Sequence, residues 1–124
     1  MFFRYWFPVL VWVALIFYLS GIPRLGTGLE YDFLLRKCAH VAEYAVLSFL
    51  FARALLASFQ GMVSILLTIN LVVVILYASL DEFHQSFVPG RVSDWKDVLA
   101  DTIGGFLGGG IYPYRRRISH KENI

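Results

Sequence analysis

The sequence has few charged residues for its length. Only 16% of its 124 residues are Asp, Glu, Lys or Arg, whereas soluble domains carry about 25%. Hydrophobic residues make up 58% of the chain, and the mean hydropathy is +0.64. The segment 62–80 contains no formal charge, and a run of this length crosses a hydrocarbon core of about 30 Å. The composition therefore predicts a membrane protein rather than the alternative, a soluble all-helical domain with apolar core helices.

Several functional classes lack their sequence signature here. Cys38 is the only cysteine, so no intramolecular disulfide can form. The net charge of +2 is too small to indicate binding to nucleic acid. Neither a phosphate-binding P-loop nor the G-x-S-x-G elbow of hydrolases is present. The sequence HVAE at residues 40–43 reverses the Glu-x-x-His order of di-iron bundles, so we predict no metal and no cofactor.

Four apolar segments predict an all-α membrane protein, a bundle of four transmembrane helices. They cover residues 5–20, 37–57, 62–80 and 97–114. No small-residue cleavage site follows the first segment, so we interpret it as a retained span and not as a signal peptide. We expect residues 1–114 to form one domain and residues 115–124 to form a basic, poorly ordered tail.

The basic residues favour one orientation in the membrane. Four spans place both termini on the same side. Residues 115–117 are consecutive arginines directly after the last span, and such clusters are retained on the cytoplasmic side. Arg53 lies 16 positions after Lys37, which is about 24 Å along a helix, so its side chain can extend to the same interface. We therefore predict cytoplasmic termini.

Polar residues gather at the opposite, outer ends of three spans. The segment DEFHQSFVPGR, residues 81–91, directly follows the uncharged run. In each span the polar residues are spaced to share one helix face. These sets are Lys37, His40 and Tyr44 in the second span, Asp81, His84 and Gln85 in the third, and Asp94, Asp97 and Asp101 in the fourth. Ionisable groups inside a membrane are costly and usually face a bundle interior or an aqueous cavity. We therefore predict a polar site between three helices, in which Glu43 and Asp101 most need partners.

The residue types in this site suit anion binding combined with proton transfer. Lys37 and Arg91, with Arg36 nearby, can hold a phosphate, a pyrophosphate or a carboxylate. Asp81 or Glu82, paired with His40 or His84, can transfer a proton.

A structural interpretation stays open for the same region. Ser93 or Asp94 can cap the fourth helix, and the helix dipole favours Asp97 in its first turn. Lys37 can be an interfacial anchor. In that case the polar residues only hold the four helices together.

The fourth span also contains a glycine-rich stretch, GGFLGGG. It pairs Gly104 with Gly108 and Gly105 with Gly109, the small-xxx-small spacing that lets helices approach closely. We predict that these glycines pack within the bundle rather than at a homodimer contact.

The two segments that carry the polar residues resemble the VanZ-like family of membrane proteins. They are residues 37–50, KCAHVAEYAVLSFL, and residues 81–109, DEFHQSFVPGRVSDWKDVLADTIGGFLGG. The family pattern Lys-x-x-His-x-x-x-Tyr falls on Lys37, His40 and Tyr44. Its Asp-Glu-x-x-Gln, Pro-Gly-Arg and following Asp elements fall on Asp81, Glu82, Gln85, Pro89, Gly90, Arg91 and Asp97. The chain departs from the pattern at Asp101, where the family has Asn, and this adds a negative charge inside the span.

The resemblance implies a protein of the bacterial cytoplasmic membrane. The family's namesake is associated with low-level resistance to teicoplanin, an amphiphile that acts at the outer leaflet. An outward-facing site is suitably placed to bind an anionic lipid, a lipid-linked cell-wall precursor or the drug. The residues predicted for this binding site are Lys37, His40, Tyr44, Asp81, Glu82, Gln85, Arg91, Asp97 and Asp101.

Three functions remain open at this point. The first is a binding protein of the cell envelope. The second is an intramembrane enzyme that acts on a phosphorylated or lipid-linked envelope substrate, with Asp81, Glu82 and His40 as the candidate catalytic groups. The third is a structural or partner-binding bundle.

Overall fold

Four helices make up the structure. A computed structural model of the chain describes residues 2–21, 32–88 and 95–122. The helices are α1 (Phe2–Ser20), α2 (Asp32–Ser58), α3 (Val63–Gln85) and α4 (Trp95–Glu122), and the described residues contain no strand. The all-α prediction is therefore confirmed, with each helix close to a predicted apolar segment.

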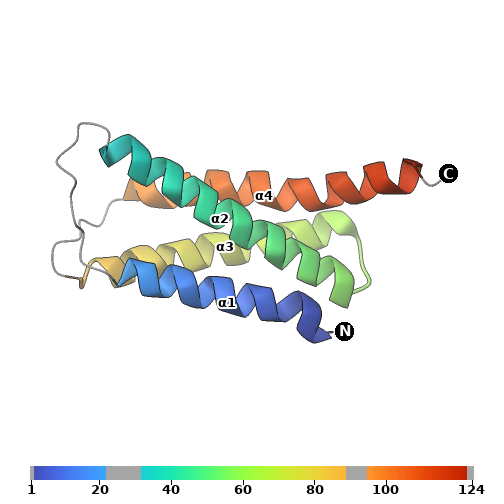
Figure 1. Cartoon of the computed structure of the whole chain (residues 1–124), viewed down its shortest axis with the longest axis horizontal. Coiled ribbons are helices and arrows are strands. Elements are labelled where there is room, and N and C mark those ends of the chain that lie inside the picture. Colours follow the sequence, from blue (N-terminus) through green and yellow to red (C-terminus); the bar gives the residue numbers. More distant parts are fainter. Residues whose placement is uncertain (1, 22–31, 89–94, 123–124) are drawn as a thin grey trace.

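The helices run alternately up and down (Figure 1). Helix α2 packs against the other three, most extensively against α4, whereas α1 contacts α2 and α3 but not α4 within the described residues. Both chain termini lie at one end of the bundle, which we call the termini end. At the other end α1 and α3 finish and α2 and α4 begin, and we call this the polar end.

Three of the helices are long and apolar enough to cross a membrane. They span Phe2–Ser20, Leu34–Ser58 and Val63–Gln85. Among the described residues α4 does not meet the same measure of length and hydropathy, so the prediction of four such spans is corrected to three. The reason lies in its composition. Lys96, Asp97 and Asp101 occupy its first turns, and glycine, which adds little hydrophobicity, fills much of the stretch before Arg115.

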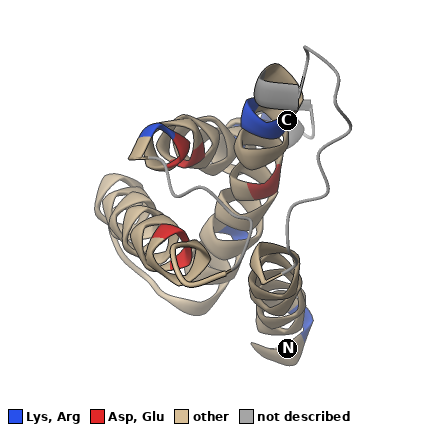
Figure 2. Ribbon diagram, turned by 90° about the vertical axis from the view of Figure 1, so that its left-hand side faces the viewer, with Lys and Arg blue, Asp and Glu red and all other residues tan. Residues whose placement is uncertain are grey.

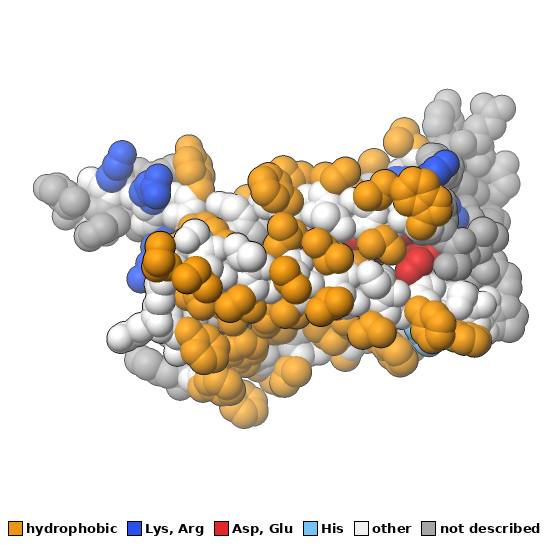
Figure 3. Space-filling view, turned by 180° about the vertical axis from the view of Figure 1, so that it is seen from behind, with side chains coloured by type: hydrophobic (Ala, Val, Ile, Leu, Met, Phe, Trp, Pro, Cys, Tyr) orange, Lys and Arg blue, Asp and Glu red, His pale blue; other side chains and the backbone are white. Residues whose placement is uncertain are grey.

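The outer surface of the bundle is apolar. Large hydrophobic side chains are exposed on every helix, among them Phe3 at 75%, Leu10 at 66%, Leu76 at 59% and Phe106 at 71%. Figure 3 shows hydrophobic side chains over the middle of one face and charged side chains toward its two ends. A soluble monomer rarely exposes apolar patches of this extent, but a lipid-facing surface does. The surface therefore supports the membrane assignment made from composition.

Glycines set the close contact between α2 and α4. A Cβ atom at Gly104 would overlap the carbonyl oxygen of Val41, and one at Gly108 would overlap that of Ala45. Only glycine lets the two backbones approach this closely. The prediction that these glycines pack within the bundle is therefore confirmed, and the contact brings the polar face of α4 against α2.

The basic segment after residue 114 differs from expectation. We expected residues 115–124 to be poorly ordered, but α4 continues to Glu122. Once a helix is nucleated, each added residue extends it at little cost in free energy. The part of α4 that packs against α2 therefore nucleates the helix that continues through the basic segment. The arginines at 115–117 therefore lie on a helix at the termini end.

Candidate functional site

Three residues of α2 point at acidic partners on α3 and α4. Lys37 pairs with Asp97. The Nδ1 atom of His40 lies 2.7 Å from Oδ1 of Asp101, and the Tyr44 hydroxyl donates to Oδ2 of Asp81 over 3.1 Å. The spacing i, i+3 and i+7 places all three side chains on one helix face, as predicted. We use the name polar cluster for Lys37, His40, Tyr44, Asp81, Glu82, Gln85, Asp97 and Asp101.

His40 lies between two carboxylates of α4. Its Nε2 atom is 3.9 Å from Oδ2 of Asp97, while its Nδ1 atom contacts Asp101. His40 is 5% exposed, Asp97 1% and Asp101 0%. Buried charges need opposite charges and hydrogen bonds. Here basic side chains alternate with carboxylates in the order Lys37, Asp97, His40, Asp101. An imidazole held in this way can accept or release a proton.

Asp81 forms the second part of the polar cluster. Its Oδ2 atom accepts from Tyr44 and, more weakly, from Nε2 of Gln85 at 3.5 Å. Gln85 and Glu82 are also buried. Figure 2 looks along the bundle from the polar end and shows acidic residues on α2, α3 and α4 but none on α1. Because His40 and Tyr44 of α2 contact Asp101 of α4 and Asp81 of α3, acidic residues of α3 and α4 meet α2 at the polar end.

The buried carboxylate oxygens of this cluster include two, Oδ1 of Asp81 and Oδ2 of Asp101, that have no hydrogen-bond partner among the described residues. A buried acceptor without a donor costs about 1–3 kcal/mol, so such atoms are uncommon in folded proteins. These two oxygens are acceptors that the donors of a ligand, or water, can satisfy.

A second polar layer lies deeper in the bundle, and sequence reasoning missed it. Asn70 donates from Nδ2 to Oγ of Ser48 over 2.8 Å, and Ser48 donates to the carbonyl oxygen of Gly105 over 2.5 Å. The available signal was the spacing along α2, since Ser48 is four residues after Tyr44 on the face of the polar cluster. Asn70, the one amide side chain in the uncharged run 62–80, was the second indication.

His84 does not join the polar cluster. Its Nδ1 atom lies 3.3 Å from Oγ of Ser20, and its ring stacks on Phe17 with centroids 4.4 Å apart. The predicted shared face is thus correct for Asp81 and Gln85 and wrong for His84. Consecutive residues of a helix point about 100° apart, so His84 and Gln85 face different sides of α3, and His84 lies against Ser20 and Phe17 of α1.

The basic residues of the predicted anion site are only partly placed. Lys37 is paired with Asp97, and Nε of Arg36 lies 4.0 Å from the same carboxylate. Arg91 and Asp94, with the Pro-Gly turn, lie outside the described residues. The described part of the site contains four buried acidic residues, Asp81, Glu82, Asp97 and Asp101. Arg36 and Lys37 both lie beside one of them, Asp97.

Glu43, expected to need a partner, is half-buried beside the cluster. Its backbone carbonyl accepts a hydrogen bond from Nε1 of Trp12 over 2.9 Å, which ties α1 to α2. Within the described residues, no three His, Cys, Asp or Glu side chains are placed to hold a metal ion. The polar cluster offers hydrogen-bond acceptors at its carboxylates and a group for proton transfer at His40.

Comparison with protein families gave a match. A family model described as VanZ/LLP1 matches residues 3–116, which is nearly the whole chain. Comparisons with curated proteins and with solved structures gave no match.

Proposed function

We propose that this chain, which belongs to the VanZ/LLP1 family, binds the headgroup of an envelope lipid or of a lipid-linked cell-wall precursor at its polar cluster. The observation that carries the proposal is the pair of buried carboxylate oxygens, on Asp81 and Asp101, that lack donors among the described residues. They lie at one end of a bundle whose outer surface is apolar, where a headgroup meets the protein.

The proposed membrane arrangement includes α4 as a fourth crossing. Its acidic residues Asp97 and Asp101 are buried against α2, while Ile103, Phe106 and Leu107 are exposed on its outer side. A helix that satisfies its polar groups inside the bundle can lie in lipid despite a modest hydropathy. The polar end then faces outward, and both termini are cytoplasmic in the inner membrane, as residues 115–117 favour.

The chemistry of the site defines the class of headgroup. Carboxylate oxygens accept hydrogen bonds from hydroxyl, amide or ammonium groups. Arg36 and Lys37 beside Asp97, together with Arg91, supply positive charge for a phosphate or pyrophosphate. A headgroup with both a phosphate and several hydroxyl or amide donors fits this combination, and lipid-linked wall precursors are of this kind.

A role in resistance to teicoplanin follows as part of the same proposal. At the outer leaflet, a protein that binds either the headgroup of a wall precursor or the amphiphilic drug itself alters how much drug reaches its target. The association of the family's namesake with this drug supports this role.

An intramembrane enzyme is the second candidate, and one contact favours it. His40 and Asp101 lie 2.7 Å apart in a buried site, a geometry suited to proton transfer. In that case the bound lipid is also converted. A purely structural bundle is the third candidate, and it predicts neither binding nor conversion.

One experiment separates these functions. Purified full-length protein in nanodiscs is incubated with an envelope lipid extract and repurified, and its lipids are measured by mass spectrometry. Asp81→Asn and Arg91→Ala are compared with wild type, and Arg4→Ala, an exposed arginine at the opposite end, is the matched control.

The outcomes differ for each function. We expect wild type and the control to retain one lipid class that Arg91→Ala releases and Asp81→Asn holds more weakly. A new lipid species that is absent with Asp81→Asn indicates the enzyme instead. Equal lipid profiles in every variant contradict binding and leave the structural bundle.

A further inference from the structure

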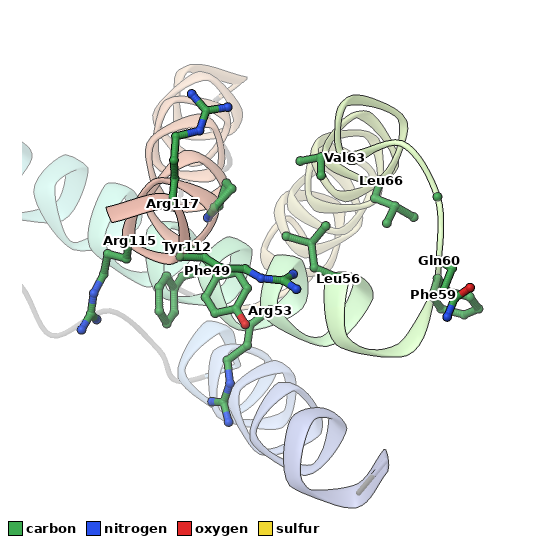
Figure 4. Close-up of a pocket in the computed structure, with 13 residues that line it drawn as sticks. Phe49, Arg53, Leu56, Phe59, Gln60, Val63, Leu66, Tyr112, Arg115 and Arg117 are labelled. Carbon is green, nitrogen blue, oxygen red and sulfur yellow. The ribbon is translucent and has the colours of Figure 1, made fainter. Parts of the chain in front are cut away.

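A groove at the termini end of the bundle is lined by arginine and apolar side chains. It lies between the last turns of α2, the first turn of α3 and the C-terminal part of α4, and it has a volume of about 1260 Å³ (Figure 4). Four of its lining residues are arginines, Arg53, Arg115, Arg116 and Arg117. This groove is at the opposite end from the polar cluster and takes no part in the function proposed above.

Among the residues whose side chains are described, no opposing charge lies in this groove. None of its lining residues is acidic. The acidic residues whose side chains are described are Glu43, Asp81, Glu82, Asp97 and Asp101. Glu43 is the one on α2, and it lies ten positions before Arg53, which is about 15 Å along the helix. The field at the groove is therefore positive, and it favours an anionic occupant.

Arg53 and Arg116 both line the groove. The Arg53 guanidinium lies over the Tyr5 ring, 4.9 Å from its centroid. Such stacking holds the planar head in place and leaves the N–H groups at its edge available for an anion. Arg116 also lines an adjoining hollow of about 530 Å³, so it lies between the two cavities. In Figure 4 the Arg115 and Arg117 side chains point away from each other.

The rest of the groove is apolar. Phe49 and Tyr112 meet edge to face, with centroids 5.7 Å apart, and Leu56, Val63 and Leu66 continue the lining. Apolar walls add nothing to the binding of free phosphate. They can contact acyl chains, because an acyl chain then exchanges lipid contacts for protein contacts of the same polarity. The combination of an arginine head and apolar walls matches an amphiphile.

We infer that this groove binds an anionic glycerophospholipid, with its phosphate at Arg53 and Arg116 and its acyl chains along Phe49, Leu56 and Leu66. Basic pockets between transmembrane helices on the cytoplasmic side are suited to such headgroups. The lipid would join the ends of α2 and α4 where these helices face the membrane interface.

Native mass spectrometry tests this inference. Full-length protein in detergent is titrated with phosphatidylglycerol or with phosphatidylcholine of the same chain length. The test variant is Arg53→Gln/Arg116→Gln. The control variant is Arg4→Gln/Lys121→Gln, which removes the same charge from exposed residues at the same end that line neither hollow.

We expect the test variant to bind phosphatidylglycerol about 25-fold more weakly, about fivefold for each arginine. The control is expected to change by less than about twofold, and binding of phosphatidylcholine is expected to be weak in all proteins. If the control loses as much affinity as the test variant, only general attraction to negative charge is at work and the inference is wrong. Displacement of phosphatidylglycerol by an equal concentration of inorganic phosphate also overturns it, because the apolar walls then contribute nothing.

Arg116→Gln alone, compared with Arg4→Gln, keeps the test valid if the Arg53 substitution disturbs folding. Arg116 is exposed, so its replacement leaves the bundle intact, and about a fivefold loss is expected. No loss in this single variant overturns the assignment of the phosphate to Arg116.

Discussion

The Nδ1 atom of His40 lies 2.7 Å from Oδ1 of Asp101, across the contact between α2 and α4. Both side chains are buried. The contact depends on glycine, because Gly104 lets the backbone of α4 approach Val41, one residue along α2 from His40. A histidine and a carboxylate that are each costly in lipid therefore satisfy one another inside the bundle.

Substitutions at Asp101 distinguish a hydrogen bond from a charge. Asp101→Asn keeps an oxygen that accepts from His40, so we expect lipid retention within about threefold of wild type. Asp101→Leu removes the acceptor, and we expect a loss of about 1–3 kcal/mol in the free energy of unfolding. Both are measured by lipid retention and by thermal unfolding in detergent. Complete loss of function in a stably folded Asp101→Asn protein would show that the carboxylate itself is needed, as in the enzyme.

The pair between Lys37 and Asp97 is expected to stabilise the polar end. Asp97→Asn leaves Lys37 without its buried counter-charge, while His40 keeps the carboxylate of Asp101. We expect a cost of about 2 kcal/mol, below the value for a fully buried pair, because Lys37 is only half-buried. Lys37→Met/Asp97→Asn should recover part of this loss, and thermal unfolding measures both. Lys121→Met, at an exposed lysine near the other end of α4, is the control. Additive effects of the two substitutions would contradict the pairing.

The glycine contact offers a matched pair of substitutions. Gly108→Ala places a methyl group against the carbonyl of Ala45, and we expect it to destabilise the bundle by about 1–3 kcal/mol. Gly110→Ala, two residues further on, meets nothing within 4 Å and should be neutral or add up to about 1 kcal/mol through helix propensity. The comparison uses thermal unfolding in detergent. Equal effects at the two positions would mean that close packing of α2 and α4 is not what Gly108 provides.

Cysteine labelling tests the proposed orientation. In a Cys38→Ser background, Lys96→Cys places a thiol at the polar end and Lys121→Cys places one at the termini end, and both positions are exposed. A membrane-impermeant maleimide added to intact spheroplasts should label the first and reach the second only after lysis. Labelling of residue 121 in intact spheroplasts would reverse the orientation.

Drug susceptibility tests the proposed role in resistance. Expression of wild type in a susceptible Gram-positive host should raise the inhibitory concentration of teicoplanin about two- to fourfold, on the order of 1 kcal/mol or less of effective competition for the drug or its target. Asp81→Asn and Arg91→Ala should lose the effect at equal protein levels, while Arg4→Ala keeps it. No change on expression of wild type rules out this role in that host.

Most of the helical architecture was predictable, because it depends on local properties of the sequence, which are the length of the apolar runs and the helical spacing of polar residues. Long apolar runs predicted the helices α1, α2 and α3. The spacing of Lys37, His40 and Tyr44 predicted a shared face, since helix periodicity is a local property. The fourth span was the exception. Its polar and glycine residues lower its hydropathy. Their role is to pair with and pack closely against α2, and the sequence of one helix does not show this.

The amino-acid sequence by itself therefore determined which residues share a helix face and which end of each helix is polar. Tertiary structure alone decided the partners across helices. His40 faces Asp101, Ser48 joins Asn70 with the Gly105 carbonyl, and His84 turns away to α1. It also brought Arg53 beside residues 115–117 in one groove. These pairings depend on how close and at what angle helices cross, and that is set by side chains far apart in the chain.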